Sequence, residues 1–467
     1  MTVHEACGIF GIYAPGEDVA RLAFFALFAL QHRGQESSGV ASADGESIWL
    51  HTGMGLVSHV FDEPSLSRLT GGLAIGHNRY STMGSSQLFN AQPIVVKGAA
   101  GTIALAHNGN IVNAEALRRE LTTQGYSISS TSDSEIIAYL MADAPGRTMV
   151  ERISHAMRRL EGAYSLVVLT KDCLIGVRDP MGVRPLCLGQ LDNGQVLASE
   201  SCALDHIGAR FIREVQPGEI VTVDARGITG HQGMVPERKA LCVFEYIYFA
   251  RPDSTIGGRP LYWAREEMGA GLAREYPVDA DVVIGVPDSA TIAAISYARE
   301  SGIPFSEGLL KNRYVGRTFI EPDQRIRELG VAVKFNPLRE ILDGKRVVVV
   351  DDSIVRGTTT PRIVALLRRA GAREVHMRVC APPICYPCFF GVDMATRWEL
   401  LAARLSVPEI RDFIGADSLG YLSLDGLIKA VDLPGDGLCL ACLTGNYPIP
   451  VQLEMDKLAL EALPTAE

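Results

Sequence analysis

The sequence predicts two domains of different class, an α+β domain followed by an α/β domain. The chain has 467 residues, which is enough for two or three domains. Up to about Pro236, strand-like runs joined by turns outnumber helical patterns, which fits a layered αββα domain. Farther on, the apolar runs Val282–Val286, Val347–Val350 and Val375–Val379 alternate with helical patterns. This alternation predicts a parallel sheet with ligands beyond the carboxyl ends of its strands.

Composition narrows the class of protein. Hydrophobic residues make up 47% of the chain and charged residues 21%, as in ordinary globular proteins. A net charge of −10 argues against a general nucleic-acid binder but leaves room for a nucleotide site. The longest apolar run, Leu22–Leu30, is too short to span a membrane, and Met1–Ala6 lacks the basic start and apolar centre of a secretion signal. We therefore expect a cytoplasmic protein that binds neither membranes nor nucleic acids.

The first chemically notable residue is Cys7, at the start of the strand-like run Cys7–Tyr13. One interpretation is a buried strand cysteine, which is common. The other is a nucleophile that becomes the N-terminal residue once residues 1–6 are removed. Its own α-amino group could then serve as the base, because an amine titrates near neutrality and lies within reach of the side chain.

Four polar segments follow in the first half, each of them an ordinary turn or helix cap by itself. They are Leu30–Gly39, Gly76–Thr82, Ala106–Asn110 and Thr131–Glu135. The third contains Asn-Gly, a pair that favours positive φ. The polar stretch Gly230–Lys239 then predicts a domain boundary, giving a first domain at 7–236, a second at 240–450 and a tail at 451–467.

The most informative stretch of the second half is Val347–Thr360. Four valines lead to Asp351 and Asp352, then to a loop of hydroxyls around Gly357 and a helical pattern from Pro361 onwards. Loop amides and hydroxyls at a helix N-terminus can hold a phosphate, and paired carboxylates can hold ribose hydroxyls or hydrated Mg²⁺. The alternative is a simple turn into a capped helix.

Two other segments add candidates. Asp281–Ala290 repeats the strand–loop–helix pattern, with Ser289 in its loop, and Leu309–Phe319 is unusually basic for an acidic chain, although it could be a solvated loop. Of the ten cysteines, Cys439 and Cys442 have the spacing of a metal-binding pair. Spacing alone leaves zinc and an iron–sulfur cluster equally open.

Together, and in this order, the motifs resemble the family of glutamine phosphoribosylpyrophosphate (PRPP) amidotransferases over nearly the whole chain. The resemblance implies an N-terminal nucleophile (αββα) glutaminase domain followed by a type I phosphoribosyltransferase domain with a parallel sheet. It implies the conversion of glutamine, PRPP and water into 5-phosphoribosylamine, glutamate and diphosphate, the first step of de novo purine biosynthesis. Ammonia would pass from the Cys7 site to the PRPP site.

The resemblance also assigns roles in the first domain. Residues 1–6 would be a propeptide cleaved between Ala6 and Cys7, and Cys7 would attack the side-chain amide of glutamine. The oxyanion would be held by Asn108 and Gly109, and the glutamine by Arg79, Thr82 and Asp133.

In the second domain, the resemblance assigns PRPP to a loop and a flexible lid. The PRPP-binding residues would be Asp351, Asp352, Ser353, Arg356, Gly357, Thr358, Thr359, Lys311, Arg313, Tyr314, Arg317 and Lys334. Mg²⁺ would be held by Ser289, Asp351 and Asp352, and a [4Fe–4S] cluster by Cys242, Cys388, Cys439 and Cys442. The family further implies feedback inhibition by purine nucleotides and a homodimer or homotetramer.

Two other functions compete with this interpretation. An amidotransferase with a different acceptor, such as a sugar phosphate, is disfavoured by the Val347–Thr360 stretch. A regulator that senses PRPP through a decayed phosphoribosyltransferase domain is disfavoured by the presence of Cys7, Arg79, Asn108 and Asp133.

Overall fold

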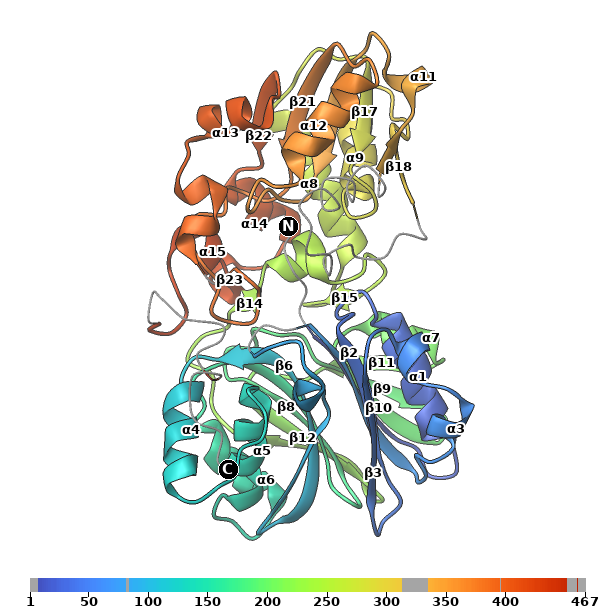
Figure 1. Cartoon of the computed structure of the whole chain (residues 1–467), viewed down its shortest axis with the longest axis vertical. Coiled ribbons are helices and arrows are strands. Elements are labelled where there is room, and N and C mark those ends of the chain that lie inside the picture. The colour runs from blue at the N-terminus through green and yellow to red at the C-terminus, as the bar shows by residue number, and fades with distance from the viewer. Residues whose placement is uncertain (1–6, 81–83, 313–334, 395, 452–459, 461–467) are drawn as a thin grey trace.

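The chain folds into two domains that lie one above the other in Figure 1. This computed structural model describes residues 7–80, 84–312, 335–394, 396–451 and 460. Within these residues no helix is long and apolar enough to cross a membrane.

The first domain is built on two antiparallel sheets packed face to face. One sheet has the order β11 (Arg210–Glu214), β9 (Cys187–Leu191), β10 (Gly194–Ala198), β1 (Gly8–Tyr13), β4 (Leu73–Arg79), β2 (Ser37–Ala43), β3 (Ile48–Met54). The other has the order β13 (Gly227–Gln232), β12 (Glu219–Asp224), β8 (Leu174–Arg178), β7 (Gly162–Leu169), β6 (Gly101–Ile111), β5 (Ile94–Gly98). Apolar side chains such as Ile9, Ile75 and Val167 fill the space between the sheets.

Helices cover the outer faces of both sheets and complete the αββα layering that the sequence predicts (Figure 1). On the first sheet lie α1 (Val19–Ala29) and α7 (Ser201–His206), with the short α2 (Val57–Val60) and α3 (Glu63–Leu66) beside them. On the second sheet lie α4 (Ala114–Thr123), α5 (Asp133–Asp143) and α6 (Met149–Met157). A short turn, η1 (Leu88–Asn90), precedes β5.

The second domain contains the expected parallel sheet. Its order is β17 (Val282–Gly285), β20 (Arg346–Asp351), β21 (Glu374–Val379), β22 (Ser418–Tyr421), and all three pairings are parallel. Successive valines of β20 enter different cores, because Val348 and Val350 pack with α8 (Leu261–Glu275) and α9 (Thr291–Ser301), whereas Val347 and Val349 pack with α12 (Thr360–Arg369). The strand is therefore buried on both faces, as its run of β-branched residues predicts.

The remaining elements of the second domain are short. They are η2 (Glu245–Phe249), α11 (Arg339–Leu342), η3 (Arg397–Glu399), η4 (Leu401–Ala403), α13 (Val407–Ile414), α14 (Leu424–Val431), η5 (Gly435–Gly437) and α15 (Ala441–Thr444). Three two-stranded ribbons pair β14 (Leu241–Cys242) with β23 (Leu438–Cys439), β15 (Thr255–Ile256) with β16 (Arg259–Pro260), and β18 (Leu309–Lys311) with β19 (Phe335–Pro337).

The predicted linker is more ordered than its composition suggests. Its first residues, up to Gln232, belong to β13, and the Ala240 and Cys242 amides donate to the carbonyls of Met181 and Val183 in the first domain. Of the predicted tail the structure describes Val451 and Leu460, and Leu460 is buried in the core of the first domain under α4–α6. The domain limits drawn from the sequence stay a prediction.

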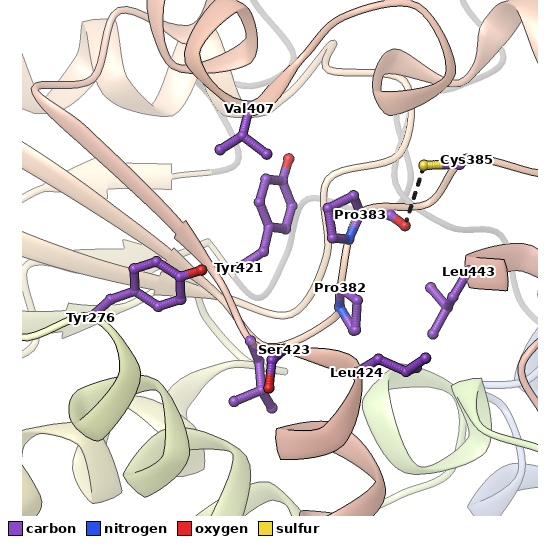
Figure 2. A pocket seen from close by; sticks show the side chains of 10 residues that line it. Tyr276, Pro382, Pro383, Cys385, Val407, Tyr421, Ser423, Leu424 and Leu443 are labelled. Carbon is purple, nitrogen blue, oxygen red and sulfur yellow. Dashed lines mark hydrogen bonds between the residues drawn. The ribbon is translucent and has the colours of Figure 1, made fainter. Parts of the chain in front are cut away.

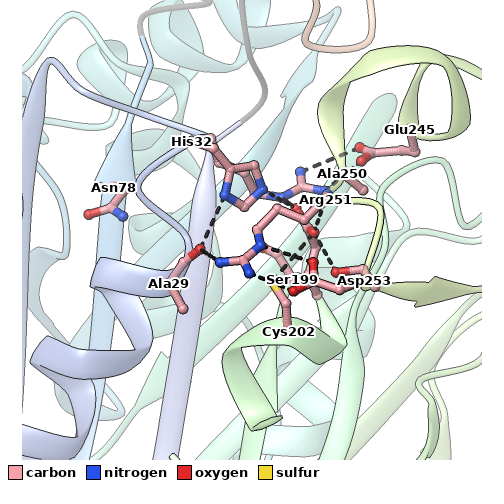
Figure 3. A network of polar contacts seen from close by, with 12 residues as sticks. Ala29, His32, Asn78, Ser199, Cys202, Glu245, Ala250, Arg251 and Asp253 are labelled. Carbon is pink, nitrogen blue, oxygen red and sulfur yellow. Dashed lines mark hydrogen bonds and ion pairs between the residues drawn. The ribbon is translucent and has the colours of Figure 1, made fainter. Parts of the chain in front are cut away.

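Buried charges join the two domains. Arg33 pairs with Glu200 of its own domain and with Glu245 of the second domain, and Arg184 also reaches Glu245 at 3.2 Å. All four side chains are fully buried. Glu200 extends the network across the interface, where it accepts from the Ser254 hydroxyl at 2.7 Å and the Arg251 amide at 2.9 Å. Figure 3 shows Glu245 and Arg251 of this network, with His32 of the first domain close to them.

This network predicts that Glu245→Gln will destabilise the protein strongly. The substitution leaves Arg33 and Arg184 buried with less counter-charge, and breaking a buried ion pair in this way typically costs about 3–5 kcal/mol. Denaturant unfolding of the variant should show this loss in the free energy of unfolding. Glu300→Gln is the control, because the Arg274–Glu300 pair is 46% and 39% exposed and should be worth less than about 1 kcal/mol. Equal losses in both variants would contradict a special role for the buried network.

Candidate active sites

Cys7 lies immediately before β1, near the middle of the seven-stranded sheet. The pairing of Gly8 with Asn78 brings it beside the end of β4, where the Tyr80 amide donates to Cys7 Sγ at 3.4 Å. The Cys7 thiol in turn donates to the Tyr80 carbonyl at 3.2 Å. Burial raises the pKa of Cys7 to about 11, although the Tyr80 backbone and Arg79 oppose the rise. The thiol is therefore neutral at pH 7 and needs a base before it can act as a nucleophile.

The side chain of Asn108 has the properties of a hydrogen-bond donor that is held in place for a ligand. It lies near the end of β6 and is fully buried, yet neither its Nδ2 nor its Oδ1 has a hydrogen-bond partner in the described part of the chain. A buried amide without partners costs about 1–3 kcal/mol, so such a group calls for an explanation. A bound substrate that accepts from Nδ2 would provide it.

Gly109 follows with φ +147°, a conformation that side chains rarely adopt. A Cβ atom here would lie 2.0 Å from the Ala163 carbonyl oxygen. Only glycine fits this position, in keeping with the positive φ that Asn-Gly favours. The expected turn is wrong, however, because Ala106–Asn110 continues strand β6 and pairs with β7.

The predicted glutamine ligands converge on the same region. Asp133 begins α5 and accepts from the Ile111 amide at 3.2 Å, and its Oδ1 lies 3.5 Å from His107 Nδ1. Burial favours a higher pKa for Asp133, but His107 and the Ile111 amide outweigh it and the pKa is lowered. The charges of Arg79 and Asp133 both act on Cys7, so the three groups share one site.

Arg79 carries a partner that the sequence did not reveal. It forms an ion pair with Glu36 and donates to the Ser85 carbonyl at 3.1 Å. Glu36 stands in the polar segment Leu30–Gly39, but a carboxylate in such a segment has no signal that identifies its partner. The predicted ligand Thr82 lies outside the described residues.

In the second domain, Asp351 ends β20 and Asp352 follows it directly, as predicted. Both are buried, and the Asp352 amide donates to Asp351 Oδ1 at 2.9 Å. Asp352 accepts from the Ser289 hydroxyl at 2.5 Å and the Ser353 hydroxyl at 2.6 Å. Burial raises the pKa of Asp352 against these hydrogen bonds. Ser289 therefore lies beside the aspartate pair, although it is far from the pair in the sequence.

The loop after Asp352 turns directly into a helix. Gly357 has φ +68°, and a Cβ atom there would lie 2.6 Å from Leu401 Cδ2. Thr359 is the N-cap residue of α12, although its side chain makes no capping hydrogen bond, and the first turn of the helix contains proline. Arg356 is held by Glu399 at 2.9 Å. Ser353, Thr358 and Thr359 thus precede the N-terminus of α12 in one loop, and an anion would be favoured at that N-terminus.

The predicted lid is described only at its base. Lys311 ends β18 and pairs with Asp288 at 2.5 Å, beside Ser289 in sequence. Because β18 pairs with β19, Lys311 lies opposite Phe335. The other candidates lie outside the described residues: Arg313, Tyr314, Arg317 and Lys334.

The four predicted cluster cysteines gather where the domains meet. The parallel pairing of β14 with β23 sets Cys242 opposite Cys439. Cys442 is influenced electrostatically by Cys388, Cys439 and Cys242, and burial raises the pKa of all four thiols, that of Cys242 to about 11. The charge of Arg184 opposes the rise at Cys242, Cys388 and Cys439. Among the described residues, no group of three or more His, Cys, Asp or Glu side chains is arranged to hold a metal ion.

A separate apolar cavity of about 370 Å³ lies between β22, α14 and α15 (Figure 2). Tyr276, Pro382, Pro383 and Leu443 are among its lining residues, as is Cys385. None of the predicted site residues lines it. The cavity therefore gives no support to either predicted site.

The unpartnered amide of Asn108 leads to a prediction about stability. Asn108→Ala removes no hydrogen bond and relieves an unpartnered amide, so it should destabilise the protein by less than about 1 kcal/mol. Asn78→Ala is the matched control, because Asn78 is also fully buried but donates to the Leu27 carbonyl at 2.6 Å and accepts from Ser38 at 3.2 Å. Its loss should cost about 1–3 kcal/mol more, measured by denaturant unfolding. A larger loss at Asn108 than at Asn78 would show that Asn108 serves the fold.

Comparison with known proteins agrees with both halves of the structure. The family model described as a glutamine amidotransferase domain matches residues 77–206, and that of a phosphoribosyl transferase domain matches residues 264–385.

Full-length relatives extend this agreement. The chain is 50% identical to an amidophosphoribosyltransferase of Synechococcus elongatus, covering 98% of this chain and 95% of the relative. It is 53% identical to one of Archaeoglobus fulgidus, covering 95% and 98%. A solved glutamine PRPP amidotransferase from B. subtilis, complexed with ADP and GMP, superposes with a TM-score of 0.91 at 45% identity over 97% of this chain and 100% of the other. The chain belongs to the amidophosphoribosyltransferase family.

Proposed function

We propose that the first domain releases ammonia from glutamine at Cys7 and that the second domain transfers it to C1 of PRPP. One observation carries this proposal. A single chain holds a buried thiol and a buried, unpartnered side-chain amide in one domain, and a buried aspartate pair at the start of a hydroxyl-rich loop before a helix in the other. The products would be 5-phosphoribosylamine, glutamate and diphosphate, and the reaction would open purine biosynthesis.

In the glutaminase half, the neutral Cys7 requires a base, and we assign this role to its own α-amino group after cleavage between Ala6 and Cys7. The sulfur then attacks the amide carbon, and the oxyanion accepts hydrogen bonds from Asn108 Nδ2 and the Gly109 amide. The protonated amine of the base gives its proton to the departing ammonia. Water hydrolyses the resulting thioester to glutamate and restores the thiol.

Three further residues would hold the glutamine. Asp133, ionised at neutral pH, takes the substrate ammonium, and Arg79 takes the carboxylate, with Thr82 as an additional contact. Because Arg79 is paired with Glu36 in this structure, the substrate carboxylate must share or displace that partner. An arginine fork has enough donors for two carboxylates.

In the transferase half, the residues fit a hard cation. Two carboxylates and a hydroxyl, from Asp351, Asp352 and Ser289, are the oxygen donors that Mg²⁺ prefers alongside substrate phosphates. A bound Mg²⁺ would neutralise the leaving diphosphate. The loop residues Ser353, Arg356, Gly357, Thr358 and Thr359 would hold PRPP, and the cations at the lid would add charge and exclude water: Lys311, Arg313, Arg317 and Lys334, together with Tyr314.

The cysteines also fit a cofactor. Four sulfurs with no histidine among them form a soft donor set, in which Cys242 and Cys442 are buried and Cys388 and Cys439 half-buried, and Arg184 supplies positive charge nearby. Cys242, Cys388, Cys439 and Cys442 would hold a [4Fe–4S] cluster, which takes four cysteine thiolates, as in the family that the sequence resembles. We therefore propose a cluster at Cys242, Cys388, Cys439 and Cys442.

Our proposals about regulation and oligomeric assembly are based on similarity to related proteins. The B. subtilis structure contains ADP and GMP, so purine nucleotides are the proposed feedback inhibitors here, and a homodimer or homotetramer is the proposed assembly. We also propose a cytoplasmic location.

Cys7→Ala tests the division of labour. Synthesis of 5-phosphoribosylamine from glutamine should be abolished, because no nucleophile remains, whereas synthesis from added ammonia should continue at a rate close to that of the parent protein. The two activities are measured with PRPP present, and the N-terminal residue of the active parent protein should be Cys7. Glutamine-dependent activity that survives in the variant, or an active protein that still begins at Met1, would contradict the proposal.

The proposed cofactor has a spectroscopic test. Anaerobically purified protein should be brown, with broad visible absorbance and about four irons per chain. Cys439→Ser should lose the iron and most of the colour, because a ligand from the pair is missing. Cys380→Ser is the control, since Cys380 is a buried cysteine outside the proposed set. A colourless parent protein that contains one zinc would reject the cluster.

A further inference from the structure

The second domain touches the first domain at Gly109 of β6. Gly391 has φ +97°, and a Cβ atom placed on it would lie 3.0 Å from the carbonyl carbon of Gly109 and 3.1 Å from its Cα. The backbones of these two glycines are therefore in close contact across the interface. Gly109 is the residue whose amide the proposed mechanism uses.

The next residue of β6 fastens the same contact. Asn110 is 6% exposed, and its Nδ2 donates to the Phe389 carbonyl at 2.9 Å. The two residues are far apart in the sequence and belong to different domains. The bond lies within the buried interface, where a backbone carbonyl cannot exchange its partner for water.

The segment that bears Phe389 is itself held firmly. The Phe390 carbonyl accepts from Arg184 at 3.1 and 2.8 Å, and the Phe390 amide donates to Cys388 Sγ at 3.4 Å. The rings of Phe389 and Phe390 are buried and pack against Tyr447. Two consecutive carbonyls of the second domain thus accept from side chains of the first domain.

We infer that Asn110 is a positioning residue for amide hydrolysis, which ties the oxyanion donors Asn108 and Gly109 to the Cys388–Gly391 segment of the second domain. This inference rests on the proposed function. Asn110 touches no reacting atom and acts through the backbone of β6. Because the donors must lie within a fraction of an ångström of the developing oxyanion, a small displacement of Gly109 lowers the rate of amide cleavage without weakening the binding of glutamine elsewhere.

Asn110→Ala is the direct test. The kcat for glutamine-dependent synthesis should fall about tenfold. This is less than the roughly 10²-fold loss of rate that a 1 Å displacement can cause, because we expect a smaller displacement of Gly109. The KM for glutamine should stay within about twofold, since Arg79 and Asp133 are unchanged, and ammonia-dependent synthesis should be unaffected. Asn113→Ala is the matched control: its Nδ2 also donates to a backbone carbonyl, that of Arg159 at 2.8 Å, but at the surface. It should change neither constant.

A binding measurement separates positioning from a general structural role. The aldehyde analogue of glutamine forms a hemithioacetal with Cys7, whose oxygen needs the same donors, whereas glutamate does not. Asn110→Ala should weaken binding of the aldehyde about tenfold and leave that of glutamate unchanged. Equal weakening of both ligands, or no change in either, overturns the inference.

A second variant covers the case in which Asn110→Ala does not fold. Gly391→Ala leaves Asn110 intact and presses on Gly109 from the opposite domain, so it should lower the same kcat and the same aldehyde affinity. Unchanged values in a folded Gly391→Ala variant overturn the inference. The proposed function fails separately, when Cys7→Ala retains glutamine-dependent activity. If Cys7 is required but Asn110→Ala and Gly391→Ala leave the kcat and the aldehyde affinity unchanged, the positioning role is rejected and the proposed function stands.

Discussion

The buried charges between the domains are the constraint on which the rest of the structure depends. Arg33, Arg184 and Glu245 have no access to water, so each ion has lost hydration worth several kcal/mol. That cost is offset only when every partner is in place, because a shift of one domain leaves charges unpaired in a medium of low dielectric. The network therefore permits one relative placement of the domains. The same Arg184 also holds the Phe390 carbonyl, so this placement extends to the segment that touches Gly109.

Two features of the glutaminase site serve its chemistry and not the stability of the fold. Cys7 is buried as a neutral thiol, and Asn108 keeps an amide without a partner in the described structure. Neither feature stabilises the native state. Both are explained if the site is complementary to an intermediate that is absent from the resting protein, since preorganised donors are most effective when they do not have to move at the moment of reaction. The rigid layers of the αββα core supply the stability that offsets these costs.

Much of this arrangement is predictable from the sequence, and what is not has a common physical cause. The valines before Asp351 predict a strand buried on both faces, and the Asn-Gly pair at Gly109 predicts positive φ, because both signals are local. The pairing of Arg79 with Glu36 and of Arg33 with Glu245 depends on contacts between distant segments, which composition and spacing do not encode. The bond from Asn110 to the Phe389 carbonyl is harder still to predict. Every residue has a backbone carbonyl, so nothing in the sequence indicates which one accepts from Asn110.

The contact between Gly109 and Gly391 also explains why the glutaminase site can be sensitive to small movements of the second domain. Side chains absorb small displacements by changing rotamer, but two backbones in contact have no such freedom. Gly109 has no room for a side chain because of the Ala163 carbonyl, and Gly391 has none because of Gly109 and Arg184. A displacement of the second domain therefore moves Gly109, a proposed oxyanion donor, directly. An enzyme that releases ammonia in one domain for use in another gains from this, because amide cleavage then becomes efficient only when the domain that uses the ammonia is correctly seated.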